Sequence, residues 1–169
     1  TYALTLIGMV MCSLGANAQE TTIYRPDFND FVESQNGECE WNAETKTISW
    51  TSASGNNVLN VKFTGLPEGK MPVGTKFVVK AKLVNDAKSF RMFIGGDCKA
   101  DCGDGENVME LTEDKVVTEW RLGGPGWQTA AELQGTGGIE IEDIYIERPN
   151  GTIEEDPLPE IIPAPAENP

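Results

Sequence analysis

The sequence predicts an all-β protein, folded as a two-sheet antiparallel β-sandwich of the jelly-roll type. Apolar residues recur with period two along almost all of residues 19–148, and no stretch sustains the spacing of an amphipathic helix. Clusters of Gly, Pro and Asn divide this region into short segments. Because half-polar alternation buries one side of each strand and solvates the other, it is typical of two stacked antiparallel sheets.

Most of the predicted strands alternate clearly between apolar and polar residues. In 76–84, Phe77 and Val79 share one face, and Lys80 and Lys82 share the other. The same pattern predicts strands at 46–52, 58–63, 76–84, 89–96, 107–113 and 116–122. Each has one apolar face to contribute to a common core.

The last predicted strand, 138–148, changes parity in its middle. Ile139 and Ile141 lie on one side of the strand, and Ile144 and Ile146 lie on the other. Both pairs can face the core only if one extra residue is inserted between them. The sequence therefore predicts a β-bulge near Glu142 and Asp143, which would re-aim the Asp143 side chain.

The two ends of the chain differ from the middle. Residues 1–18 carry no charge and end in small residues, which predicts a signal peptide cleaved after Ala18, with a short buried helix as the alternative. Residues 149–169 hold six of the ten prolines and are acidic, which predicts a semi-rigid linker. The predicted organisation is therefore a signal peptide (1–18), a β-sandwich domain (19–148) and an acidic linker (149–169).

Export and charge restrict the expected partners. The signal peptide predicts a secreted, periplasmic or cell-surface protein without membrane insertion after cleavage. A formal net charge of −14 argues against nucleic acid and anionic lipid, and leaves neutral glycans and divalent cations as compatible ligands. The linker predicts a downstream domain or a cell-surface assembly as a further partner.

The chain contains no histidine, which bears on catalysis. Ser-His-Asp and Cys-His arrangements are impossible without it, and zinc sites lose their commonest ligand. No nucleophile-elbow, phosphate-loop or dinucleotide-binding motif occurs. We therefore expect a protein that is not an enzyme.

Three of the four cysteines follow residue 18: Cys39, Cys98 and Cys102. Exported proteins meet an oxidising compartment, so one disulfide is expected, with one thiol left over. Cys98 and Cys102 are the preferred pair, because they lie close together in the Gly-rich stretch 95–107. A bridge to Cys39, or three free thiols, are the alternatives.

The end of the sequence resembles a known fold family. The stretch GTGGIEIEDIYIERP resembles the closing strand of galactose-binding-like jelly-roll domains, and VTEWRLGGPGW before it resembles their penultimate strand and loop. Many carbohydrate-binding modules of secreted bacterial glycosidases share this fold. The resemblance implies polysaccharide binding by an accessory module. It also implies a structural calcium near the closing strand, for which Asp143 is the matching position.

A second candidate cation site comes from the residues alone. The stretch 95–107 concentrates Asp97, Asp101 and Asp104 among glycines, and calcium favours several oxygen ligands at a flexible turn. Its spacing differs from the twelve-residue calcium loop. A solvated acidic loop is the favoured alternative.

Sugar binding needs an exposed aromatic ring beside hydrogen-bonding groups. Trp127 follows a Gly-rich turn and Trp41 lies in a polar stretch, so both are candidate platforms. Trp50 and Trp120 share parity with apolar neighbours and are predicted to be core residues.

Three further candidate ligand residues face away from the apolar side of their strands. These are Phe93, Tyr145 and Arg91, which shares parity with Phe93. Contacts with neighbouring loops or ion pairs with carboxylates are the alternatives.

The expected function is non-catalytic polysaccharide binding by an exported accessory module. One alternative is a structural or adhesive spacer that binds no sugar. Another is the N-terminal part of a glycoside hydrolase whose catalytic domain lies beyond Pro169.

Overall fold

The computed structural model describes residues 19–26, 33–34, 39–50, 57–61, 69–124 and 137–151. Within these ranges all helix or strand structure is β, in agreement with the predicted fold class. The predicted signal peptide and the linker beyond residue 151 lie outside the described residues.

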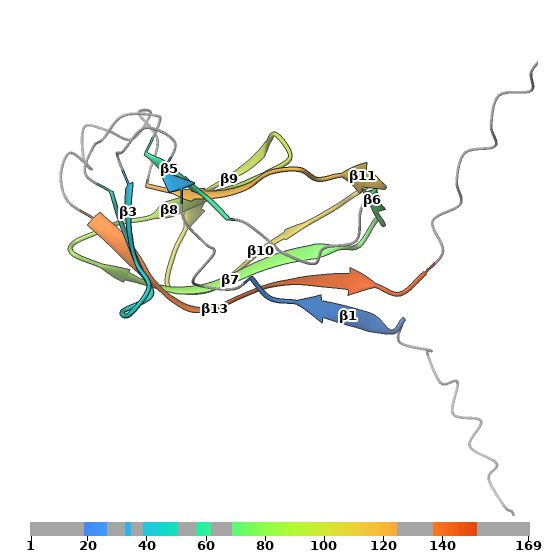
Figure 1. The fold of residues 1–169 in the computed structure, drawn as a ribbon, viewed down its shortest axis with the longest axis horizontal. Coiled ribbons are helices and arrows are strands. Elements are labelled where there is room, and N and C mark those ends of the chain that lie inside the picture. The colour runs from blue at the N-terminus through green and yellow to red at the C-terminus, as the bar shows by residue number, and fades with distance from the viewer. Residues whose placement is uncertain are drawn as a thin grey trace, which may run out of the picture.

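The strands form two antiparallel sheets and a small ribbon (Figure 1). The six-stranded sheet, called sheet A, contains β1 (Thr21–Tyr24), β3 (Cys39–Asn42), β4 (Thr47–Trp50), β7 (Lys76–Val84), β10 (Gly105–Glu110) and β13 (Gly137–Pro149). The five-stranded sheet, sheet B, contains β2 (Glu33–Ser34), β5 (Val58–Asn60), β8 (Phe90–Ile94), β9 (Asp97–Cys102) and β12 (Trp120–Gly123). The ribbon pairs β6 (Lys70–Met71) with β11 (Lys115–Val116). This arrangement confirms a β-sandwich, whereas the jelly-roll connectivity stays a prediction.

Strand β13 organises sheet A. One of its edges pairs with β7 from Gly138 to Glu147. It also pairs with β4 over Gly137–Glu140 and with β1 over Ile146–Pro149. A strand with neighbours on both edges is buried on its inner face and hydrogen-bonded along most of its length, so β13 anchors the sheet.

The predicted bulge in β13 is confirmed. Ile141 is paired with Ala81 and Asp143 with Lys80, so Glu142 is the extra residue. The isoleucines before and after the bulge are all buried: Ile139, Ile141, Ile144 and Ile146. The insertion restores the alternation in the second half of β13 and leaves Asp143 and Tyr145 on the outer face.

The inner faces of the two sheets meet in one apolar core. Trp120 of sheet B packs edge-on against Phe77 of sheet A, with ring centroids 5.3 Å apart and an interplanar angle of 87°. Trp50 is 3% exposed and Trp120 is 4% exposed, which confirms both as core residues. Their burial removes two of the four tryptophans from the candidate ligand surface.

Strand β9 corrects the prediction of a loop at 95–107. Gly95 and Gly96 both have positive φ, at 52° and 95°, and form the two-residue turn between β8 and β9. This geometry matches the right-handed twist of a hairpin. The sequence signal failed because β9 is an edge strand whose residues are exposed except at Cys102, so it shows no alternation.

The two ends of the described domain lie side by side. Thr21 is paired with Pro149 in the β1–β13 ladder. Beyond the ladder, the Asn150 N–H donates to the Glu20 carbonyl oxygen at 2.7 Å. The Thr22 hydroxyl donates to Oδ1 of Asn150 at 2.6 Å.

Candidate functional site

The structure separates the sequence-predicted ligand residues. Arg91 and Phe93 lie on the outer face of sheet B, whereas Tyr145 lies on the outer face of sheet A. Trp41 is partly buried and packs against the core from edge strand β3, and its role as a platform stays a prediction. Trp127 lies outside the described residues.

Phe93 is the centre of a composite surface on sheet B. It is half-buried, and its cross-strand neighbours are Arg121 on β12 and Cys98 on β9. The guanidinium carbon of Arg91 lies over its ring at 5.0 Å from the centroid, and that of Arg121 at 5.3 Å. These distances are within the range of cation–π attraction. We call Phe93, Arg91, Arg121 and Asn57 the Phe93 surface.

Arg91 reaches across the sheet because of a glycine. Its cross-strand neighbour on β12 is Gly123, and the guanidinium donates to Oδ1 of the buried Asn57 at 2.9 Å. A Cβ on Gly123 would lie 2.7 Å from both the Asn57 carbonyl oxygen and Cγ1 of Val58. Gly123 therefore keeps the backbone around Asn57 close to β12.

The electrostatics of Arg91 follow from this position. Burial lowers the pKa of Arg91, and the positive charge of Arg121 acts in the same direction. The guanidinium is still charged at neutral pH, because the ordinary arginine pKa lies far above it. Arg91 is therefore a half-buried cation held between an aromatic ring and an amide.

Arg121 and Asn57 were not among the sequence candidates. Arg121 also forms an ion pair with Glu119 at 3.3 Å, and the Glu119 side chain is 52% exposed. Arg121 stands between Trp120 and Leu122, two predicted inward residues, so the alternation of the strand already placed Arg121 on the outer face. Asn57 gave no such signal, since its contact with Arg91 depends on the order of β5, β12 and β8 in the sheet.

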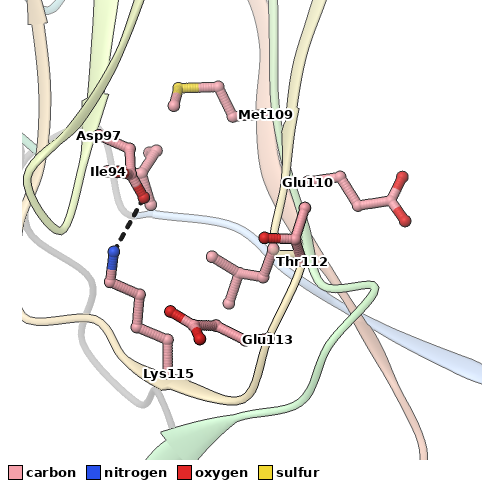
Figure 2. A pocket seen from close by; sticks show the side chains of 8 residues that line it. Ile94, Asp97, Met109, Glu110, Thr112, Glu113 and Lys115 are labelled. Atoms are coloured by element: carbon pink, nitrogen blue, oxygen red, sulfur yellow. Dashed lines mark hydrogen bonds and ion pairs between the residues drawn. The ribbon is translucent and has the colours of Figure 1, made fainter.

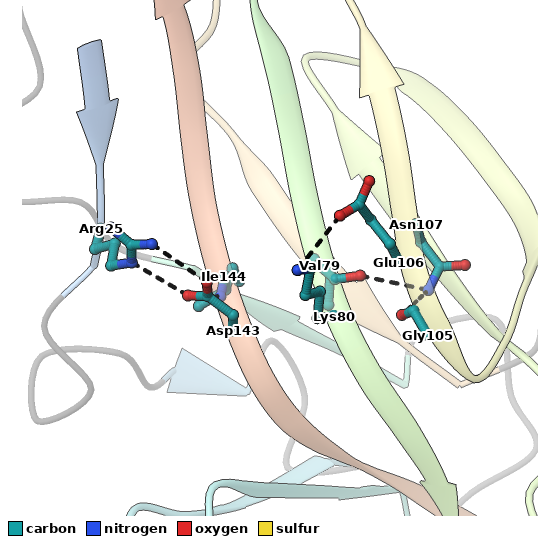
Figure 3. Close-up of polar contacts among 8 residues, drawn as sticks. All are labelled: Arg25, Val79, Lys80, Gly105, Glu106, Asn107, Asp143 and Ile144. Atoms are coloured by element: carbon teal, nitrogen blue, oxygen red, sulfur yellow. Dashed lines mark hydrogen bonds and ion pairs between the residues drawn. The ribbon is translucent and has the colours of Figure 1, made fainter.

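The outer face of sheet A holds Tyr145 in a different environment. Arg25 donates two hydrogen bonds of 3.2 Å to the Asp143 carboxylate, and its guanidinium carbon lies 5.2 Å from the Tyr145 ring centroid. Figure 3 shows this pair beside Lys80, which forms an ion pair with Glu106 at 3.6 Å. Hydrogen bonding from Arg25 lowers the pKa of Asp143.

The predicted calcium ligands are not brought together. Asp97 forms an ion pair with Lys115 at 2.8 Å, and Asp104 accepts the Leu83 N–H at 2.7 Å. Asp101 lies exposed on β9. In the described part of the chain, no three His, Cys, Asp or Glu side chains form a group that could hold a metal ion. Calcium binding by these residues or by Asp143 stays a prediction.

The predicted Cys98–Cys102 disulfide is not formed, since both thiols and that of Cys39 are free in the structure. Cys98 lies opposite Phe93 and Cys102 opposite Phe90 in the β8–β9 ladder, so the two residues are separated by three residue steps of β8, roughly 10 Å. A disulfide needs Cα atoms within about 7 Å. Cys98 is exposed, whereas Cys102 is buried and burial raises the pKa of its thiol to about 11.

A separate pocket of about 270 Å³ opens at the junction of β8, β9, β10 and β11. Figure 2 shows Met109 at one side of the pocket and Lys115 at the other. The ammonium of Lys115 points across it to Asp97. The full lining is Ile94, Asp97, Met109, Glu110, Leu111, Thr112, Glu113 and Lys115.

Comparisons with protein-family models, curated proteins and solved structures found no match. Among the described residues, none forms a helix long and apolar enough to cross a membrane. The functional proposal therefore rests on the chemistry of the described side chains.

Proposed function

We propose that this chain is a non-catalytic carbohydrate-binding module, and that the Phe93 surface holds the sugar. The observation that carries the proposal is the partly exposed Phe93 ring with guanidinium groups 5.0 and 5.3 Å from its centroid. In this proposal the module is exported by its signal peptide, has a jelly-roll fold and meets a polysaccharide. Its linker joins it to a downstream domain or a cell-surface assembly.

The chemistry of a sugar fits this surface. A pyranose offers apolar C–H groups, which pack on an aromatic ring or on the plane of a guanidinium. Its hydroxyls accept hydrogen bonds from arginine, which has five N–H donors. The amide of Asn57 holds the Arg91 guanidinium in place, which lowers the entropy lost on binding.

Binding at this surface is expected to be weak for one sugar unit. A sheet face leaves much of the ligand in water, so few contacts are fully desolvated. A module of this kind gains its effect by holding a tethered partner near a polymer with many identical units. The proposal does not require calcium, because the described contacts at Phe93 come from an aromatic ring, arginines and an amide.

The test is a glycan-array or affinity-gel screen of wild type, Phe93→Ala and Tyr145→Ala. Wild type and Tyr145→Ala should be retained on the same polysaccharide, and Phe93→Ala should lose retention. Thermal denaturation establishes that each variant is folded.

Two outcomes would change the proposal. Equal retention of folded Phe93→Ala and loss in Tyr145→Ala would move the site to sheet A. A negative result for wild type across neutral and acidic glycans would favour the alternative of a structural or adhesive spacer.

A further inference from the structure

We infer that Asn150 and Gly151 form a site of spontaneous deamidation, at which the Thr22 hydroxyl assists attack of the Gly151 backbone nitrogen on the Asn150 side chain. The reaction converts a neutral amide into a carboxylate at the point where the chain leaves the domain. Its only reactants are the chain itself and water. The site lies at the β1–β13 end of sheet A, so the inference is independent of the proposed sugar site on sheet B.

Asn150 combines exposure with a following glycine. Among the described asparagines it alone precedes a glycine, and both residues are exposed beyond the end of β13. The nitrogen of the next residue has to reach Cγ of the asparagine, and a side chain on that residue obstructs the approach. Glycine has no Cβ and the widest choice of backbone conformations. Among the described residues, only Nε2 of Gln19 would lie within 4 Å of a Cβ built on Gly151, at 3.5 Å.

Hydrogen bonds hold Asn150 beside β1. Its backbone N–H donates to the Glu20 carbonyl oxygen at 2.7 Å, and its side-chain oxygen Oδ1 accepts the Thr22 hydroxyl at 2.6 Å. Thr22 is itself placed by the ladder, opposite Arg148. The side chain that is attacked is therefore held in place, while the residue that attacks it extends beyond the ladder.

The reaction starts when the Gly151 backbone N–H loses its proton to hydroxide. The nitrogen then forms a bond to Cγ of Asn150, and negative charge develops on Oδ1. The bond between Cγ and Nδ2 breaks, and Nδ2 takes up a proton and leaves as ammonia, which gives a five-membered succinimide. Water opens this ring at Cγ to give aspartate, or at the former backbone carbonyl carbon to give isoaspartate.

The Thr22 hydroxyl stabilises the step in which charge develops on Oδ1. A donor already placed at the oxygen that becomes negative lowers the barrier, because nothing has to reorganise when the charge appears. The same bond polarises the amide carbonyl, which makes Cγ more electrophilic.

Asn42 is the contrasting case within the same sheet. It is also exposed, and its Oδ1 accepts the backbone N–H groups of Glu44 and Thr45 at 3.0 Å each. The next residue, however, is Ala43, whose side chain obstructs the attacking nitrogen. Donors at the oxygen are therefore present at both sites, and the unobstructed nucleophile is present only at Asn150.

Conversion changes the end of the domain. Aspartate keeps an acceptor for the Thr22 hydroxyl and adds a negative charge. In isoaspartate the main chain runs through Cβ and Cγ, so the former side-chain oxygen becomes a backbone carbonyl oxygen and the chain beyond position 150 leaves in another direction. Deamidation would therefore alter the junction between the domain and the predicted linker as the protein ages.

The experiment follows the full chain during prolonged incubation in neutral buffer. Peptide mapping by chromatography and mass spectrometry quantifies asparagine, aspartate and isoaspartate at position 150, with Asn42 in the same digest as the internal control. Wild type should convert faster at position 150 than at Asn42, and Gly151→Ala should lose detectable conversion. Thr22→Val should slow the reaction about threefold or more, as expected for loss of one hydrogen bond, and Thr22→Ser should keep the wild-type rate.

Denaturing urea separates the role of Thr22 from that of the local sequence. Because the hydrogen bond exists only in the folded chain, wild type and Thr22→Val should convert at the same rate in urea. Thermal denaturation establishes that each variant is folded in buffer. Absence of conversion at Asn150 in folded wild type would overturn the inference. Equal or faster conversion in folded Thr22→Val would also overturn it, because the hydroxyl would then give no assistance.

Discussion

The outer faces of the two sheets are built from similar residues and differ in how charge is arranged. On sheet A, Asp143, Lys80 and Glu106 lie opposite one another on three neighbouring strands, so each cation has an anion beside it. On sheet B, Arg121 is the direct neighbour of Phe93, and Arg91 lies over the same ring. On sheet B two cations share one ring and Arg121 also pairs with Glu119, whereas opposite charges alternate across the strands of sheet A.

This difference shows which face combines cations with an aromatic ring. Alternating charges satisfy one another across strands and form a solvated surface that contributes modestly to stability. On sheet B the two arginines instead gather around one aromatic ring, where Arg91 is bonded to Asn57 and Arg121 is paired with Glu119. Aromatic exposure alone does not separate the faces, because Tyr145 and Phe93 are both half-buried and both lie near an arginine.

The largest effect is expected from deletion of Glu142, the bulge residue that decides which side chains of β13 face outward. Without it, register with β7 would point either the first or the second isoleucine pair to solvent. It would also point Asp143 or its neighbours into the core. We expect loss of the folded state, measured as loss of cooperative thermal unfolding. A cooperative transition near that of wild type would show that the sheet tolerates the shift.

Gly123→Ala should have the next largest effect, and it acts on the Phe93 surface. The new methyl group would lie 2.7 Å from the Asn57 carbonyl oxygen and from Val58. Overpacking of this kind costs about 1–3 kcal/mol. It should also displace the acceptor of Arg91. The urea concentration at the midpoint of unfolding and the retention on glycan should therefore both decrease. Unchanged retention in the destabilised variant would exclude Asn57 from the site.

Labelling of Cys98 through a mixed disulfide offers a smaller, reversible perturbation of the same surface. Cys98 is exposed and lies opposite Phe93, whereas Cys39 and Cys102 are buried. Because the pKa of Cys102 is raised to about 11, its thiol stays protonated at pH 8 and reacts slowly. A disulfide-forming reagent should label Cys98 first, as peptide mapping will show. The label should weaken glycan binding by about 1 kcal/mol, roughly fivefold, until a reductant removes it.

The smallest expected effect is the change in stability that Asp143 on sheet A causes at acidic pH. The folded-state pKa of Asp143 lies below its ordinary value of 3.8, mainly because Arg25 donates hydrogen bonds to it. Its contribution to stability is therefore present above pH 3.8 and is lost as the pH falls through the folded-state pKa. Asp143→Asn should be less stable than wild type at pH 7, and the difference should vanish in acid. Chemical denaturation at several pH values measures this difference in stability. Glycan binding by the variant at pH 7 should be unchanged.

The sequence was sufficient to predict strands that bury one face, because their apolar residues then recur at every second position. It predicted the long strands, the burial of Trp50 and Trp120, and the bulge at Glu142. The sequence did not predict β9 or the short strands β1, β2, β3, β6 and β11. Short strands give few repeats of the pattern, and the residues of β9 are exposed except at Cys102. The polar neighbours of Trp41 gave no sign that its side chain packs against the core from an edge strand.

The candidate surface was only partly predictable, for a topological reason. Parity identified Phe93 and Arg91 as outward residues, and the same rule could have identified Arg121. The contact of Arg91 with Asn57 joins residues 34 positions apart, and that of Arg25 with Asp143 joins residues 118 apart. Such contacts depend on which strands are neighbours, which hydrophobic periodicity does not specify.

The pairing of Thr21 with Pro149 has a mechanical consequence. The chain enters and leaves the domain through adjacent strands, which lie about 5 Å apart. A mature chain that begins at Gln19 would therefore have its N-terminus beside Gly151, where the predicted linker leaves the domain. Tension between these two ends would pull β1 away from β13 one hydrogen bond after another, starting at Thr21, rather than shear the ladder as a whole. A domain connected in this way is suited to hang beside a longer assembly as a side branch, and poorly suited to bear load along it.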